Sequence, residues 1–267
     1  MNPPAEVAPW IERLARVGYA AKAVLYATIG ILAAQAALGE GGGTTDTGGA
    51  LRALLQAPYG RAMLLVVALG LAGYTAWLFV RAVTDAEHRG DGAKGIALRI
   101  GDAVRGVAHG ALALAAFRLA AGDGDGGQGN GTEEWAGRLM DVPFGQALLW
   151  MAAAGVAGYG LYQLYRSWRA KLSRWLALSE LPPGTAAWVV AVSRFGIGAR
   201  GVVFLLIAWF LARAADQHDA SEAGGLAESL GALAEVGRWP LAVVALGLVA
   251  YGVYELVNAR YRRISVG

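Results

Sequence analysis

The sequence predicts an all-α membrane protein of six transmembrane helices, built as three two-helix repeats of parallel topology around a pseudo-threefold axis. Three observations predict this fold. Only 16% of the 267 residues are charged, whereas a soluble domain averages about 25%. Six apolar segments are each long enough to cross a hydrocarbon core of about 30 Å. One motif recurs three times, which indicates that one structural unit is repeated.

The recurring motif, Arg-x-Gly-x-x-x-(Lys/Arg)-(Ala/Gly)-Val, lies in the first helix of each unit. Its copies are residues 16–24, 99–107 and 194–202. The second helix of each unit carries a matching segment that ends in tyrosine, at residues 70–74, 155–159 and 247–251. Two of these helices also begin with Pro-(Tyr/Phe)-Gly, at residues 58–60 and 143–145, and the third copy has Glu235 in place of the proline. We read the repeated glycines as packing residues, because helices in lipid associate through close backbone approach.

The repeats define the expected boundaries. Repeat 1 spans residues 1–88 with helices at 15–38 and 60–83, repeat 2 spans 89–180 with helices at 97–120 and 144–167, and repeat 3 spans 181–267 with helices at 190–214 and 239–259. Helices are expected because lipid offers no partners to free backbone groups, and the runs lack the alternation of a membrane barrel. The first span resembles a secretory signal, but the same segment recurs as the third and fifth spans, so we interpret it as a span.

Basic residues predict the orientation. Seventeen of the 23 Lys and Arg residues fall at the N-terminus, in the regions 81–105 and 166–200, and at the C-terminus. We therefore expect a multi-pass protein of the bacterial cytoplasmic (inner) membrane with both termini in the cytoplasm. The loops on the other side are rich in glycine, as flexible connectors are.

Composition and motifs argue against several function classes. The chain has no cysteine and only three histidines, so cysteine-ligated metals are excluded and a histidine-built metal or haem site within one chain is not expected. No serine-hydrolase elbow or zinc-protease motif occurs, and no nucleic-acid-binding consensus is found. We expect no catalytic residues, no metal and no cofactor.

Six cations repeat at equivalent positions and are the first candidates for binding lipid or an anion: Arg16, Lys22, Arg99, Arg105, Arg194 and Arg200. Each repeat contributes two of these cations, and the second follows the first by six residues, which is about 9 Å deeper along the helix. Two interpretations stay open. The side chains could snorkel back to the phosphates and set the topology, or they could form a threefold cluster that grips anionic headgroups or lines a path for anions.

Further polar residues lie within or at the ends of the spans: Asp102, His109, Glu255, Arg118 and Arg213. Asp102, Arg105 and His109 share one helix face, and Asp102 is spaced to pair with both Arg99 and Arg105. This face fits a satisfied ion pair or, in a sharper hypothesis, a proton relay through His109. For Glu255 we expect a cationic partner such as Arg16, Arg194 or Arg200. Arg118 and Arg213 are equivalent and lie at the outer ends.

Three segments carry a family resemblance: residues 13–22 (RLARVGYAAK), the Pro-(Tyr/Phe)-Gly starts, and residues 258–263 (NARYRR). The chain resembles the bacterial family of unknown function numbered 1206 over nearly its whole length. That resemblance implies a three-repeat, six-span membrane protein and assigns no activity.

The sequence favours two functions over a third, a membrane enzyme, for which it offers no catalytic motif. The first is a non-enzymatic module whose basic helix ends contact anionic lipid or a partner. The alternative is a small-ion channel or transporter, for an anion or a proton, that uses the threefold interior. The expected partner is the phospholipid bilayer, with anionic lipids and without nucleic acid; a homo-oligomer or another protein partner stays open.

Overall fold

The computed structural model describes residues 9–85, 90–123, 131–169, 172–174 and 176–262. Its regular secondary structure over these residues is helical, apart from one isolated β-bridge between Leu176 and Arg262. Six helices are long and apolar enough to span a membrane, as predicted. They are α1 (Pro9–Leu38), α3 (Gly60–Thr84), α4 (Ala93–Ala121), α6 (Gly145–Arg169), α7 (Thr185–Gln217) and α9 (Arg238–Tyr261).

Three shorter helices connect the two long helices of each repeat: α2 (Thr47–Gln56), α5 (Gly131–Met140) and α8 (Leu226–Val236). The Pro-aromatic-Gly motif makes the sharp turn from α2 into α3 and from α5 into α6. Its aromatic residues, Tyr59 and Phe144, adopt positive φ angles of 61° and 64° and are exposed. Glycine follows because a Cβ on Gly60 or Gly145 would collide with carbonyl groups at the end of the preceding short helix.

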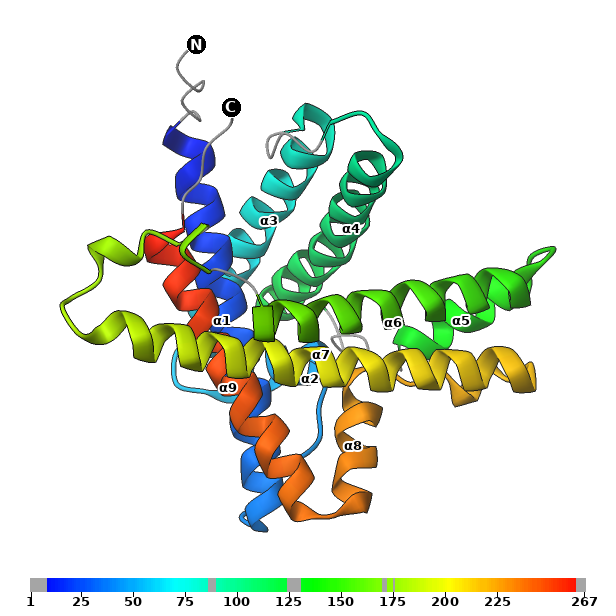
Figure 1. Cartoon of the computed structure of the whole chain (residues 1–267). Helices are drawn as coiled ribbons and strands as arrows, with labels where there is room; N and C mark the ends of the chain where they lie inside the picture. Colours follow the sequence, from blue (N-terminus) through cyan, green and yellow to red (C-terminus); the bar gives the residue numbers. More distant parts are fainter. Residues whose placement is uncertain (1–8, 86–89, 124–130, 170–171, 175, 263–267) are drawn as a thin grey trace.

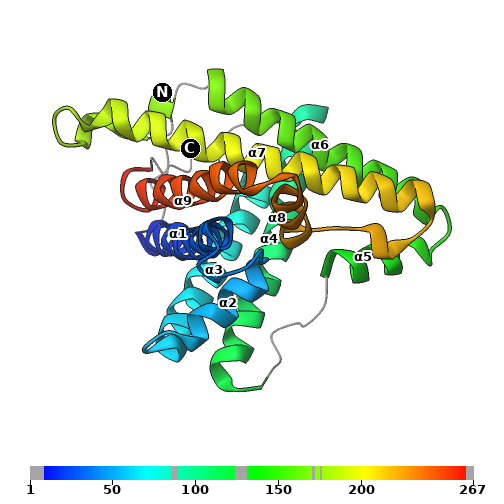
Figure 2. The same cartoon turned by 90° about the horizontal axis from the view of Figure 1, so that it is seen from below.

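The tightest helix pairs join neighbouring repeats. α3 packs on α4, α6 packs on α7, and α9 packs on α1, so the second helix of each repeat lies against the first helix of the next in cyclic order. Within repeats, α1 packs on α3 and α7 packs on α9. Figure 2 shows α7 and α3 on opposite sides of the α1–α9 pair. α1 begins and α9 ends at the same end of the molecule (Figure 1).

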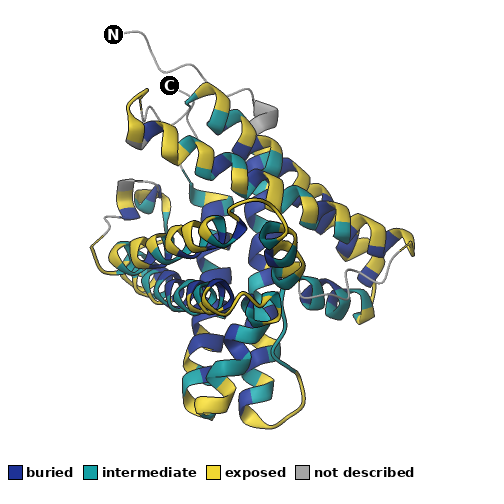
Figure 3. Cartoon of the chain, turned by 90° about the vertical axis from the view of Figure 1, so that its right-hand side faces the viewer, coloured by how far each residue is buried: buried dark blue, intermediate teal, exposed yellow. Residues whose placement is uncertain are grey.

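The pairs diverge instead of running side by side, and the α6–α7 pair crosses the α1–α9 pair steeply in Figure 1. Buried residues gather where the pairs meet, and exposed residues lie along the outward faces (Figure 3). The cyclic order of helix contacts is incomplete in repeat 2. Among the described residues, α4 and α6 have at most marginal contact, and they are the least buried of the six spans.

Glycines make the close contacts inside repeats 1 and 3. A Cβ on Gly18 would collide with Tyr74, and a Cβ on Gly196 would collide with Tyr251. The equivalent glycine of repeat 2, Gly101, has no such neighbour within 4 Å among the described residues. Repeats 1 and 3 therefore form the same close contact between their two helices, and repeat 2 does not. We call the separation between α4 and α6 the seam.

Candidate functional site

Three cations and three tyrosines from equivalent positions meet in the middle of the molecule. The cations are Lys22, Arg105 and Arg200 on α1, α4 and α7, and the tyrosines are Tyr74, Tyr159 and Tyr251 on α3, α6 and α9. All six lie near the middle of their helices. We call this set the cation–tyrosine ring.

Each cation of the ring lies by the tyrosine of its own repeat and that of the preceding repeat. Lys22 Nζ is 4.7 Å from the ring centroid of Tyr74 and 5.9 Å from that of Tyr251. The Arg200 guanidinium carbon is 4.8 Å from the Tyr251 centroid and 5.7 Å from that of Tyr159. Arg105 interacts electrostatically with Tyr159 and Tyr74. Such contacts stabilise a desolvated cation by about 2 kcal/mol or more.

Lys22 is neutralised by Glu255. Its ammonium donates a 2.6 Å hydrogen bond to the Glu255 carboxylate, and both residues are buried, with 6% and 1% of their surfaces exposed. Glu255 therefore has a cationic partner, as expected, but this partner is Lys22 and not Arg16, Arg194 or Arg200. α1 packs on α9, and this pairing of the first and last spans brings Lys22 to Glu255.

Asp102 is fully buried and pairs with two arginines. It accepts a hydrogen bond from Arg105, and Arg81 on α3 lies 3.1 Å from its other carboxylate oxygen. The second partner of Asp102 is therefore Arg81, and not Arg99 as predicted. His109 places Nδ1 2.8 Å from the Arg105 carbonyl oxygen and stacks edge-on against Tyr74.

Arg200 differs from the other two cations because it has no carboxylate partner among the described residues. Only 8% of its surface is exposed. Its Nε and Nη1 groups donate to the hydroxyls of Tyr26 and Tyr159, at 2.9 and 3.1 Å. Its Nη2 group donates no hydrogen bond to a described residue. A guanidinium has five N–H donors, so Arg200 retains donors for a further acceptor.

The ring and its immediate partners carry an excess of positive charge. Four cations, Lys22, Arg81, Arg105 and Arg200, face two carboxylates, Asp102 and Glu255. Charges within a membrane protein are costly unless they are compensated. This excess makes the region suited to an anion and unsuited to a metal cation. In the described part of the chain no three His, Asp or Glu residues lie close enough together to bind a metal ion.

Two of the three arginines that begin the repeated motif, Arg16 and Arg99, donate to backbone carbonyl groups at the end of another helix. Arg16 donates to the carbonyl groups of Ala259 and Arg260 at the end of α9, and Arg99 donates to Ala82 and Val83 at the end of α3. Cations at a helix C-terminus satisfy free carbonyl groups and complement the helix dipole. Arg194, the third member, has its own carbonyl oxygen bound by the Ser167 hydroxyl.

The first and second cations of the three motif copies thus have different surroundings. Lys22 and Arg200 are buried inside the bundle, so for these two the snorkelling interpretation is wrong. Arg105, with 37% of its side chain exposed, lies at the seam. Burial among helices from other repeats, which hydropathy does not reveal, accounts for the difference.

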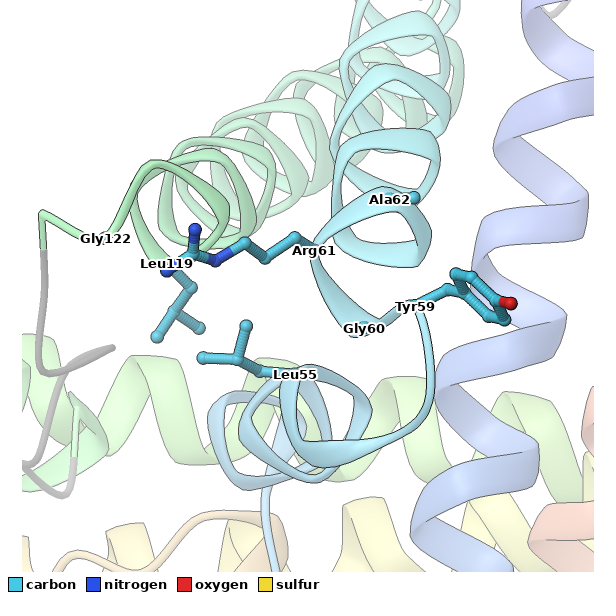
Figure 4. Close-up of a pocket in the computed structure, with 7 residues that line it drawn as sticks. All are labelled: Leu55, Tyr59, Gly60, Arg61, Ala62, Leu119 and Gly122. Atoms are coloured by element: carbon cyan, nitrogen blue, oxygen red, sulfur yellow. The ribbon is translucent and has the colours of Figure 1, made fainter.

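The outer ends of the spans hold the remaining candidates. Arg118 is exposed, and Arg213 forms a 2.9 Å ion pair with Glu222. Nearby, hydrogen bonds from the Ser221 side chain and backbone lower the pKa of Asp219. A cavity of about 720 Å³ opens between α2, α3 and α4, lined by Leu55, Tyr59, Gly60, Arg61, Ala62, Leu119 and Gly122 (Figure 4). Among the described residues that line it, Arg61 is the only charged one.

Three helical repeats, six candidate spans and a central ring of polar residues define a multi-pass membrane protein. The sequence profile described as Domain of Unknown Function (DUF1206) matches the chain three times, at residues 17–85, 100–170 and 195–262. The chain belongs to this family. It is also similar to the uncharacterized protein YxxB of Bacillus subtilis (strain 168), with 32% identity over 97% of this chain and 94% of that protein. No solved structure matches it.

Proposed function

We propose that this protein binds a small anion within the bilayer and mediates its passage across the bacterial cytoplasmic membrane. The observation that supports this is Arg200, a buried guanidinium at the middle of a span that contacts two tyrosine hydroxyls and no described carboxylate. A chloride, nitrate, phosphate or small carboxylate ion supplies both the missing negative charge and acceptors for the remaining N–H groups.

The neighbours of Arg200 suit the same ligand. Tyr159 places its hydroxyl beside Arg200, and Arg105 interacts electrostatically with both residues. Arg200 is buried among the long apolar helices, and a low-dielectric surrounding strengthens an ion–guanidinium contact relative to solution. Lys22 is already paired with Glu255, so we assign the ligand to the side of the ring formed by Arg105, Tyr159 and Arg200.

The test is binding and flux of defined anions with the purified protein. In detergent, chloride, nitrate, phosphate or acetate should raise the Tm with saturation, because a ligand that binds only the folded state stabilises it. In liposomes, the ion that raises the Tm should also be transported. Arg200→Gln should abolish both effects, whereas Arg213→Gln, at the exposed outer ion pair, should keep both. Absence of both effects in the unaltered protein with all four ions would overturn the proposal.

We propose that both termini lie in the cytoplasm, because basic residues are concentrated at that end of the spans. Glu40 and Glu180 are exposed residues, and this orientation puts them on opposite sides of the membrane. The chain lacks cysteine, so a single cysteine at either position reports its side cleanly. A membrane-impermeant maleimide should label Glu40→Cys in spheroplasts and should label Glu180→Cys only after lysis. The reverse pattern would invert the proposed topology.

A second candidate function, contact with anionic lipid, is favoured by the end of α6. Trp168 is 74% exposed, and the guanidinium carbon of Arg169 lies 4.7 Å from the centroid of its ring. An exposed aromatic residue with an adjacent cation suits the headgroup region. Loss of co-purified anionic lipid in a Trp168→Ala, Arg169→Ala variant, compared with the Arg213→Gln variant, tests this contact. Equal lipid content in the two variants would exclude it.

A further inference from the structure

Repeats 1 and 3 show how the two helices of one repeat fit together. In repeat 1, a Cβ on Gly70 would lie 2.8 Å from the Cβ of Ala21. In repeat 3, a Cβ on the equivalent Gly247 would collide with Ala199, the equivalent of Ala21. The first and second helices of these repeats therefore touch through one glycine–alanine contact and one glycine–tyrosine contact.

Repeat 2 carries the complementary surfaces but holds them apart. Gly101, Gly155 and Tyr159 are the equivalents of the contact residues in the other repeats. Neither glycine has a neighbour within 4 Å beyond its own helix among the described residues. Val104, the equivalent of Ala21 and Ala199, is 63% exposed. Each surface that faces the seam thus has a counterpart that is buried in repeats 1 and 3.

The seam lies beside the part of the ring to which we assigned the anion. Arg105 is half-buried, whereas its equivalents Lys22 and Arg200 are buried. Tyr159 is also half-buried, whereas Tyr74 and Tyr251 are buried. Closing the seam in the geometry of the other repeats would bury Arg105 and Tyr159 and would enclose the ring on all sides.

We propose that α4 and α6 form a lateral gate, which closes over the Arg105–Tyr159–Arg200 site when an anion is bound. The assignment of the anion rests on the proposed function. The gate itself rests on the repeat geometry, which specifies the contact that closure makes: Val104 against Gly155, and Gly101 against Tyr159. Because α3 packs on α4 and α6 packs on α7, the movement is a rigid-body approach of two helix pairs.

Charge explains why the anion controls the gate. Closure brings Arg105 into a desolvated space beside Arg200, and these like charges repel each other. The Lys22–Glu255 pair removes this problem where α1 meets α9, but the equivalent of Glu255 on α6 is the neutral Gln163. An anion between Arg105 and Arg200 supplies the missing charge. A ligand shifts an equilibrium only by its difference in affinity for the two states, and this ligand has more partners in the closed state.

Disulfide trapping in the full-length protein tests the gate. The native chain has no cysteine, so the double variant Val104→Cys, Gly155→Cys contains the only two thiols. A disulfide needs Cα atoms within about 7 Å, which the closed contact provides. We expect oxidation to cross-link this pair within one chain, with a yield at least threefold higher in the anion that raises the Tm than in gluconate.

Two matched pairs calibrate the measurement. Ala21→Cys, Gly70→Cys occupies the same contact in repeat 1 and should cross-link equally in all anions. Leu114→Cys, Met151→Cys joins positions on α4 and α6 that are exposed, as are their equivalents Ile31, Trp209, Val66 and Val243. It should not cross-link within one chain.

The outcomes separate the gate from the anion site. If the anion raises the Tm through Arg200 but the Val104–Gly155 pair does not cross-link, or does so equally in gluconate, the gate is overturned and the anion site stands. A cross-link between two chains, visible as a product of doubled mass, also overturns it, because a second copy then covers the seam. If no anion raises the Tm of the unaltered protein, the proposed function fails, and the gate as an anion-controlled device fails with it.

Discussion

Lys22 and Glu255 form a 2.6 Å ion pair that joins the first and last transmembrane helices, although 233 residues separate them in the sequence. The pair lies where α1 packs on α9, the contact that closes the cyclic order of helices between repeats 3 and 1. Asn258, one turn further along α9, donates a 3.4 Å hydrogen bond to the same carboxylate. The pair therefore holds α1 against α9.

Glu255→Gln should strongly lower the stability of the folded protein. It leaves Lys22 buried without a counter-charge, and breaking a buried pair by removing one partner costs about 3–5 kcal/mol. We expect a Tm in detergent that is lower by several degrees, with the anion-dependent increase in Tm retained.

The double variant Lys22→Met, Glu255→Leu provides the control, because replacing a whole buried ion pair by apolar residues is often neutral. It should recover most of the lost Tm. Equal Tm values for Glu255→Gln and the unaltered protein would show that the pair does not hold α1 against α9.

Alanine at the three equivalent glycines should have opposite effects. Gly18→Ala and Gly196→Ala place a methyl group against the backbone and Cβ of a tyrosine-bearing helix, and overpacking costs typically about 1–3 kcal/mol. Gly101→Ala meets no atom across the seam, and alanine favours a helix by about 1 kcal/mol over glycine. Thermal unfolding should therefore rank Gly101→Ala at or above the unaltered protein and the other two variants below it.

If the gate closes as proposed, Gly101→Ala should hinder its closure. The added methyl group should reduce the anion-induced cross-link between cysteines at 104 and 155 without lowering the Tm. If Gly101→Ala is as unstable as Gly18→Ala, then repeat 2 is closed in the stable state of the protein and the seam is not its resting structure.

The repeats and the six spans could be predicted from the sequence because hydropathy and motif spacing are local properties. The depth of the cations could not. Hydropathy starts the first span near residue 15, but α1 begins at Pro9 and α7 at Thr185, so Lys22 and Arg200 lie near mid-helix and not at helix ends. Polar residues before an apolar run can continue a helix, and window averages do not detect this.

Which helices pack against each other could not be predicted from the sequence either. Repeat symmetry suggests that the two helices of one repeat are partners, but the tightest contacts join α9 to α1 and α3 to α4. The partners of Glu255 and Asp102 depend on that pairing, which is why Lys22 and Arg81 were not predicted. The seam was unpredictable for another reason, since repeat 2 keeps the glycines that the closed repeats use.

Arg99 should act on stability and not on the anion. Arg99→Met removes the donors to the carbonyl groups of Ala82 and Val83 at the end of α3. A cation at a helix C-terminus contributes about 0.3–1 kcal/mol, and more when it is partly buried. We expect a small decrease in Tm, with an unchanged anion concentration at half-maximal stabilisation. A weaker apparent affinity for the anion would instead place Arg99 in the binding site.

Tyr159→Phe should weaken anion binding by about three- to tenfold while the protein stays folded. The hydroxyl of Tyr159 accepts a hydrogen bond from Arg200 at 3.1 Å and lies on the side of the ring beside Arg105. Its loss removes a donor to the anion and frees the arginine, and a net hydrogen bond contributes about 1 kcal/mol. Tyr165→Phe, on an exposed part of the same helix, is the matched control. The measurement is the anion concentration that gives half of the maximal increase in Tm. Equal values for the two variants would remove Tyr159 from the site, and the ligand would then have to be sought on the side of the ring where Lys22 faces Glu255.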